Sequence, residues 1–90
     1  MAGIAVDGTQ LSCGGIVRAS QTTVTANGTP VLRVDDLADP HDHGDDRITD
    51  ERMASGADHV SANGKAVCRA GDVSNYGKSL QSGEESIVVG

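Results

Sequence analysis

An internal repeat, present twice in full and once in part, restricts what this chain can fold into more than any other feature of its sequence. Residues 19–36 match residues 55–72, with Val, Ala, Asn-Gly, Val, Arg and Asp recurring in register. Residues 82–90 form a third, truncated copy that keeps the small opening residues and the apolar strand but not the Asn-Gly pair. A unit this short cannot bury its apolar face alone, so the copies are expected to pack against one another.

Each full copy has an Asn-Gly pair near its middle, at 27–28 and at 63–64. Asn-Gly is the favoured central pair of a type I′ turn, because that turn needs φ > 0 at both positions. The flanking residues are short and β-prone, so each copy is predicted to be a β-hairpin. The two-residue turn places the valine before it opposite the valine after it: Val24 with Val31, and Val60 with Val67.

The composition agrees with a chain of short strands and tight turns. Glycine accounts for 12 of the 90 residues, and glycine favours tight turns. There is no Phe or Trp and one Tyr, Tyr76, so Val, Ile, Leu and Ala must supply a small core. We therefore predict an all-β fold with one domain over residues 1–90, shaped as a small cone or pyramid of short β-hairpin repeats with pseudo-threefold symmetry. Residues 37–51, which separate the full copies, are acidic and are predicted to form a surface loop.

The formal net charge of −6 limits the possible partners. Nucleic-acid binding needs clustered Lys and Arg, and anionic membranes also attract basic patches, so neither partner is expected. The apolar runs are too short to span a membrane, and the N-terminus has no basic region followed by a long apolar stretch. We expect synthesis in the cytoplasm without a signal peptide. Cys13 and Cys68 are then favoured as thiols or metal ligands over a disulfide.

Three stretches together resemble a known family. Pro30-Val31-Leu32-Arg33 and Ala66-Val67-Cys68-Arg69 each follow an Asn-Gly turn, and Cys13-Gly14-Gly15 precedes the first copy. This pattern is similar to the PAAR-repeat family, which is named for a Pro-Ala-Ala-Arg stretch after a hairpin turn. The resemblance runs from about residue 8 to residue 90. It is one of pattern rather than identity, because both stretches depart from the name sequence.

The resemblance implies a pointed, metal-stabilised tip that is not an enzyme. Such a tip sits on the trimeric β-helical spike of a type VI secretion system or of a contractile phage tail, and the two kinds of machine fit this chain equally. One tip chain would cap each spike trimer, covering its open strand edges. It would be delivered outward and meet the target outer membrane during piercing. No small-molecule substrate is implied.

The family is associated with a zinc ion that three histidines and one cysteine hold near the vertex. The resemblance therefore indicates His41, His43, His59 and Cys13 as ligands of one structural zinc per chain, with iron as the alternative. His41 and His43 are two residues apart and can point to the same side. His59 has alternatives: a half-exposed strand residue, or a metal-binding pair with Cys68, which lies opposite it in the predicted hairpin. Cys68 itself is expected to be either a ligand or a small packed thiol.

Two other functions remain open from the sequence. One is a free-standing metal-binding or adaptor module, and the other is a small metallohydrolase built on the His and Cys residues. The enzyme is disfavoured because a chain of this length has little room for a concave pocket and lacks a nucleophile–base motif. The acidic cluster of residues 37–51 lacks the spacing of a calcium-binding EF-hand; its members are Asp42, Asp45, Asp46, Asp50 and Glu51. They are predicted to be solvated.

Overall fold

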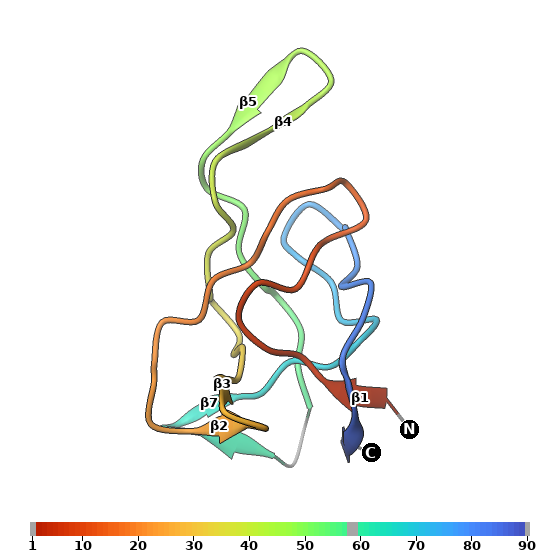
Figure 1. The fold of residues 1–90 in the computed structure, drawn as a ribbon. Helices are drawn as coiled ribbons and strands as arrows, with labels where there is room; N and C mark the ends of the chain where they lie inside the picture. Colours follow the sequence, from red (N-terminus) through yellow and green to blue (C-terminus); the bar gives the residue numbers. More distant parts are fainter. Residues whose placement is uncertain (1, 58–59, 90) are drawn as a thin grey trace.

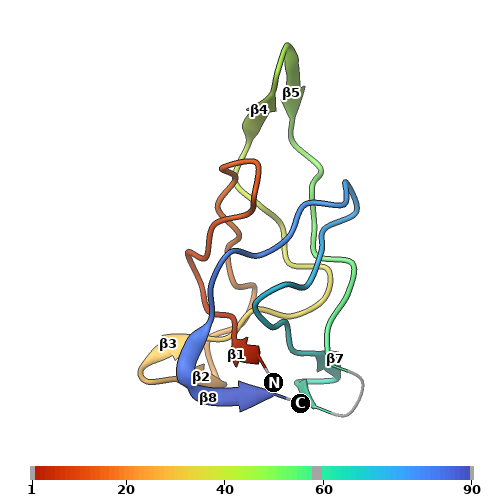
Figure 2. The ribbon, with the colours of Figure 1, turned by 90° about the vertical axis from the view of Figure 1, so that its right-hand side faces the viewer.

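The computed structural model describes residues 2–57 and 60–89 and tapers from a broad base to a narrow apex (Figures 1 and 2). Its principal extents are 36 × 23 × 22 Å. The strands are short: β1 (Ala2–Ile4), β2 (Thr25–Ala26), β3 (Thr29–Pro30), β4 (His41–His43), β5 (Asp46–Ile48), β6 (Ser61–Ala62), β7 (Lys65–Ala66) and β8 (Glu84–Val89). No described segment forms a helix long and apolar enough to cross a membrane.

The strands of the described residues pair into four two-stranded antiparallel sheets. Three of them, β2–β3, β6–β7 and β1–β8, lie at the base, and β4–β5 stands alone at the apex (Figure 2). We call this last pair the apex hairpin. The predicted all-β cone of short hairpins is confirmed.

The Asn-Gly pairs make the predicted turns. All four residues have positive φ: Asn27 51°, Gly28 86°, Asn63 52° and Gly64 84°. The predicted register is confirmed by the backbone bonds that continue each hairpin. The Val31 N–H donates to the Val24 carbonyl at 3.1 Å, and the Val67 N–H donates to the Val60 carbonyl at 3.1 Å.

The third strand pair at the base is built from two segments that are far apart in the sequence. β8, which belongs to the truncated third copy, pairs with β1, so that Ala2 lies opposite Val89 and Gly3 lies opposite Val88. The N-terminal strand therefore supplies the half of the hairpin that the third copy lacks. The two backbone segments approach very closely here, since a Cβ on Gly83 would lie 2.3 Å from the Gly3 carbonyl oxygen. Only glycine fits at such a distance.

A closed ring of backbone hydrogen bonds joins three units of the chain in the middle of the molecule. Each unit consists of one ring residue and the loop that follows it: Ala5 with 9–17, Leu32 with 36–53 and Cys68 with 72–80. Ala5 donates to Cys68, Cys68 donates to Leu32, and Leu32 donates to Ala5, each at 2.9 Å. Three further bonds beside it follow the same threefold pattern without sharing residues: Asp7 to Pro30 at 2.8 Å, Val34 to Ala66 at 2.9 Å and Ala70 to Gly3 at 2.9 Å. The ring itself closes after three bonds, one from each unit, and this confirms the predicted pseudo-threefold arrangement. We call Ala5, Leu32 and Cys68 the waist.

The apolar residues divide into an upper and a lower cluster. The upper one surrounds the waist: Ala5, Leu11, Val17, Leu32, Ala38, Met53, Cys68 and Leu80. The lower one lies between the base hairpins: Ile4, Ala26, Val31, Ala57, Ala62 and Val67. The aliphatic core that the composition predicted therefore exists, with no aromatic ring in either cluster of the described residues.

Cys68 is a packed thiol. It is fully buried and unbonded to the other cysteine. Burial, followed by the charges of Asp72 and Asp36, raises the pKa of its thiol from 9.0 to about 12. The thiolate that a metal would need is therefore disfavoured at this position.

The insertion between the full copies corrects one expectation. Residues 37–51 were expected to be a surface loop, but they form the apex hairpin and its two connections to the waist. Gly44 makes the tight turn with φ +60°, and His41 lies opposite Ile48. Ile48 is buried at 8% exposure, so this short hairpin has one apolar side chain shielded from solvent.

Candidate metal centre

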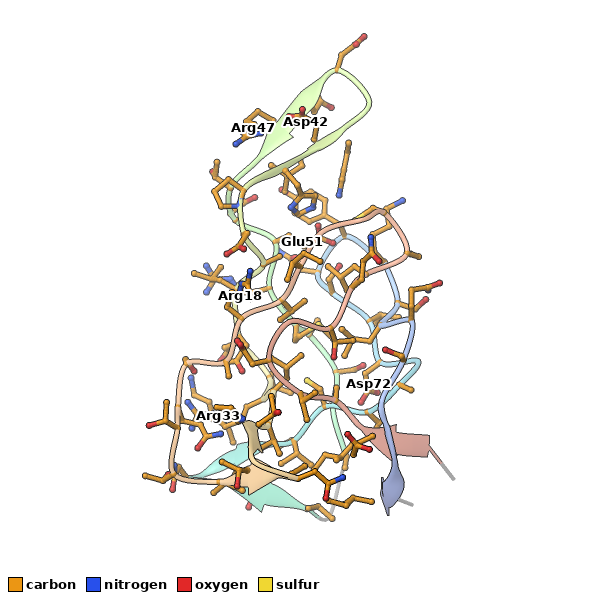
Figure 3. All side chains as sticks on the ribbon, viewed as in Figure 1. Arg18, Arg33, Asp42, Arg47, Glu51 and Asp72 are labelled. Carbon is orange, nitrogen blue, oxygen red and sulfur yellow. The ribbon has the colours of Figure 1, made fainter. Side chains whose placement is uncertain are left out.

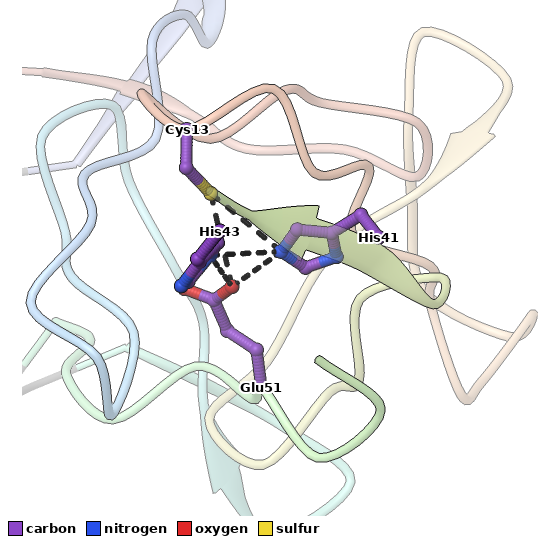
Figure 4. Close-up of side chains that lie close together, drawn as sticks. All are labelled: Cys13, His41, His43 and Glu51. Carbon is purple, nitrogen blue, oxygen red and sulfur yellow. Dashed lines mark hydrogen bonds and ion pairs between the residues drawn. The ribbon is translucent and has the colours of Figure 1, made fainter. Parts of the chain in front are cut away.

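Four side chains converge just below the apex hairpin (Figure 4). They are Cys13, His41, His43 and Glu51, and their ligand atoms all lie within 4.8 Å of one another. We call them the vertex cluster. Figure 3 places Glu51 between the apex hairpin and the body of the cone.

β4 positions both histidines. Alternate residues of a strand share one face, so His41 and His43 point inward together while Asp42 points out. The histidine side chains are only 14% and 17% exposed. The Asp42 side chain is 64% exposed and forms a 3.3 Å ion pair with Arg47 on β5. The apex hairpin is thus polar outside and presents two imidazoles inside.

Cys13 reaches the cluster from a turn that precedes the first repeat copy. Its sulfur lies 3.6 Å from Nε2 of His41. The two glycines that follow have separate roles. Gly14 adopts φ +93°, which lets the loop turn. At Gly15 a Cβ would lie 2.7 Å from Cε1 of His41, so the missing side chain makes room for the imidazole ring.

Glu51 is the residue that sequence reasoning missed. It was assigned to a solvated acidic loop, yet its side chain is 0% exposed. Its Oε1 lies 2.7 Å from Nε2 of His41 and 3.0 Å from Nε2 of His43, and its Oε2 accepts a hydrogen bond from the Ser74 hydroxyl. A buried carboxylate is costly unless it is paired or coordinates a metal, and these contacts place it as a fourth donor.

The donor set fits a small divalent metal. Two imidazole nitrogens, one thiolate and one carboxylate oxygen are the donor types that zinc takes in tetrahedral sites, where neighbouring ligand atoms lie roughly 3.3–3.8 Å apart. The sulfur of Cys13 lies 3.6 Å from His41 Nε2 and 3.7 Å from Glu51 Oε1, within that range. The two imidazole nitrogens lie 3.1 Å apart, and Glu51 Oε1 lies 2.7 Å and 3.0 Å from them. These three separations are shorter than a metal would hold them, as for groups in direct hydrogen-bond contact.

The tautomer of His41 also suits a ligand. Its Nδ1 lies 2.6 Å from the backbone carbonyl of Asp39. A carbonyl can only accept, so Nδ1 carries the proton in this contact, and in the neutral ring that a metal binds Nε2 is the nitrogen left to act as the ligand atom. An outer hydrogen bond of this kind is the usual support of a metal-binding histidine.

Tyr76 borders the cluster from a third direction. Its ring meets His43 edge-on, with centroids 5.3 Å apart, and its hydroxyl donates to Asp50 at 2.5 Å. That hydrogen bond raises the pKa of the Tyr76 phenol. Cys13 and Tyr76 each directly precede a glycine with positive φ, Gly14 at 93° and Gly77 at 78°. Similar turns in two parts of the chain therefore both reach the vertex.

The sequence-predicted ligands have three outcomes. The structure brings together Cys13, His41 and His43. His59, and with it the proposed pairing of His59 and Cys68, lies outside the described residues, and its role stays a prediction. Cys68 belongs to the waist and not to the vertex cluster.

Comparison with protein families gives one match. A family model described as the PAAR motif matches residues 4–82. The chain belongs to the PAAR-motif family. The matched region of this PAAR protein contains the waist, the two Asn-Gly hairpins and all four residues of the vertex cluster. A comparison with curated proteins found no match.

Proposed function

We propose that this PAAR chain is the structural tip that caps and sharpens the trimeric central spike of a contractile injection machine. The observation that carries the proposal is the closed three-step ring of backbone bonds at the waist, which gives a single chain the symmetry of a trimer. A monomer built this way can meet three equivalent spike strands at once, with one tip chain per trimer. In this role the chain holds a shape and performs no catalysis.

The base is the surface proposed to meet the spike. Three short hairpins surround the lower apolar cluster there, and a trimeric β-structure ends in open strand edges of the same number. Unpaired strand edges bind other strands through backbone hydrogen bonds. Contact by apolar and backbone groups depends weakly on salt, whatever the net charge of the chain.

At the opposite end, the vertex cluster is proposed to hold one structural zinc or iron ion through Cys13, His41, His43 and Glu51. When bound, the ion supplies only a cross-link, joining the loop that carries Cys13 to strand β4 and to the connection that follows β5. A small domain gains folding free energy from such a site. The chain would be made in the cytoplasm, assembled at the spike end of a phage tail or secretion machine, and carried outward to pierce the target envelope.

The test is the stoichiometry of the complex with the trimeric spike protein of the same machine. Light scattering coupled to gel filtration should give one tip chain per spike trimer, with the complex persisting in molar salt. Ending the chain at Ser86 removes the second half of β8, including Val88 and Val89, which pair with Gly3 and Ala2. It should abolish the complex, because one of the three strand pairs at the base is disrupted. Three tip chains per trimer, or a complex that dissociates in moderate salt, would contradict the proposal.

A further inference from the structure

Ser74 has an unusual position for a serine. It is 3% exposed, and its hydroxyl donates to Oε2 of Glu51, the carboxylate oxygen that does not face the histidines. Its backbone is fixed as well, because the Ser74 N–H donates to the Lys78 carbonyl at 2.8 Å and the residue forms a β-bridge with Met53. The hydroxyl is therefore held in place before it meets the carboxylate.

The hydrogen-bond capacity of this hydroxyl is fully used. A serine oxygen has one proton to donate and two lone pairs to accept with. The backbone N–H groups of Tyr76 and Lys78 donate to it at 3.2 Å and 3.3 Å. With both lone pairs occupied, the single proton has one direction left, which is toward Glu51. Ser74 can act on the carboxylate only as a donor.

The threefold arrangement shows that this hydroxyl is a local addition. In the other two units, the residue two positions after the Thr9/Asp36/Asp72 turn position is Leu11 or Ala38. Each of the three residues donates its N–H across the loop of its own unit, Leu11 to Gly15, Ala38 to Glu51 and Ser74 to Lys78. Only the unit facing the Glu51 side chain carries a hydroxyl there.

We propose that Ser74 is a positioning residue that holds Glu51 so that one carboxylate oxygen, Oε1, faces the metal. The inference rests on the proposed metal at the vertex cluster and adds a specific geometry to it. With Oε2 engaged by Ser74, the carboxylate binds through a single oxygen and the site keeps four ligands. All three units then contribute: the first gives Cys13, the second gives the histidines and Glu51, and the third gives Ser74.

The experiment compares Ser74→Ala with the parent in zinc and cobalt binding. Loss of an outer-shell partner costs about 10–100-fold in metal affinity, and we expect a loss of that size for zinc in competition with a chelator. Alanine already occupies the equivalent position at Ala38, so the fold accepts it. The cobalt form of the variant should show weaker visible d–d bands, as expected when a freed carboxylate binds through both oxygens and raises the coordination number. Ser74→Thr, which keeps the hydroxyl, should restore both readouts.

Ser55→Ala is the matched control. The Ser55 hydroxyl also donates to a carboxylate, that of Asp72 at 3.1 Å, and accepts from a backbone N–H, that of Val73 at 3.0 Å, but outside the vertex cluster. It should leave zinc affinity and the cobalt spectrum unchanged. Equal zinc affinity and equal cobalt spectra in the parent and Ser74→Ala would overturn the role of Ser74 while leaving the metal site standing.

X-ray absorption on the zinc form of the parent tests the same geometry without a variant. It should give one sulfur and three lighter ligands. A fourth light ligand in the parent, which would make five ligands in all, would also overturn the inference. A parent that binds no zinc would instead contradict the metal site itself, and the inference with it.

Discussion

The waist and the vertex of this cone are built on opposite principles. At the waist, three units contribute equivalent backbone groups, and the residues there are small or aliphatic: Ala5, Leu32 and Cys68. At the vertex, one unit supplies three of the four clustered side chains, and every one of them is polar. The waist tolerates different side chains because backbone bonds repeat without them. The vertex depends on particular atoms, because no symmetry supplies them.

The difference shows how a repeat acquires a site. The loops Thr9–Val17 and Asp72–Leu80 have equal length, whereas Asp36–Met53 is longer and contains the apex hairpin. The symmetric parts of the three units form the body of the cone, and the one longer loop forms its apex. The following experiments act on one region and measure the response of the other.

Metal removal should have the largest effect. A metal at a thousandfold excess over its Kd stabilises the folded state by about 4 kcal/mol, equivalent to roughly 16–30 °C in melting temperature for a domain of this size. A strong chelator, or His41→Ala with His43→Ala, should therefore lower the melting temperature by that order. Amide exchange should show the waist bonds of Leu32 and Cys68 still protected in the metal-free protein. Metal-free protein of undiminished melting temperature would rule out a structural ion.

A cavity at the waist should destabilise both forms alike. Leu32 is fully buried, and Leu→Ala at such a site costs about 2–5 kcal/mol. Leu32→Ala should show this loss in chemical denaturation with and without metal. Leu37→Ala is the control, since Leu37 is 45% exposed. A loss confined to the metal-bound form would mean that waist and vertex are one cooperative unit rather than two separable ones.

The base turns should respond more weakly. Gly28 and Gly64 have φ of 86° and 84°, where a β-branched residue is strained. Gly28→Val and Gly64→Val should each lose about 1–3 kcal/mol of stability from backbone strain, measured by thermal unfolding, while metal affinity stays unchanged. Thr29→Val, next to the first turn, introduces the same side chain without positive φ and should be nearly neutral. If both glycine variants melt like the parent, the type I′ assignment is wrong.

The smallest effect concerns the buried thiol of the waist. The folded pKa of Cys68, about 12, exceeds the unfolded value of 9.0. Below pH 9 both states keep the proton, and above it the unfolded chain loses its proton first, so stability falls between pH 9 and 12. At about pH 10 the loss is about 1.4 kcal/mol. Unfolding of the metal-free protein from pH 8 to 10 should show this decrease, and Cys68→Ala should lack it. Identical pH profiles would contradict the raised pKa.

Local signals in the sequence were enough for the hairpins of the base. Asn-Gly at 27–28 and 63–64 fixes its own backbone angles, so the turn type and the valine register follow from a few residues. The N-terminal partner of β8 was not foreseen. Ile4-Ala5-Val6 lacks both an Asn-Gly turn and the arginine of the other copies, and the pairing of β1 with β8 joins the two ends of the chain. Sequence similarity cannot reveal a half-repeat whose marker residues are absent.

The vertex was foreseen in part for the same reason. Cys13, His41 and His43 are residue types that metals prefer, so chemistry alone selects them. Glu51 looks like its acidic neighbours in the sequence, and what separates it from them is burial, which only the packing of three loops decides. Ser74 carries even less signal, since a serine in a turn is common. Its proposed role follows only from its contact with Oε2 of Glu51, to which its hydroxyl donates.

The closed ring of backbone bonds at the waist also has a mechanical consequence. A tapered body pushed along its axis tends to bulge sideways, and the bulge stretches whatever encircles it. The ring through Ala5, Leu32 and Cys68 encircles the axis as a hoop encircles a barrel. The tension in this hoop is carried by three bonds in series around one closed circuit, and each bond joins different parts of the chain. No single segment can slide outward without opening a circuit that the other two hold shut.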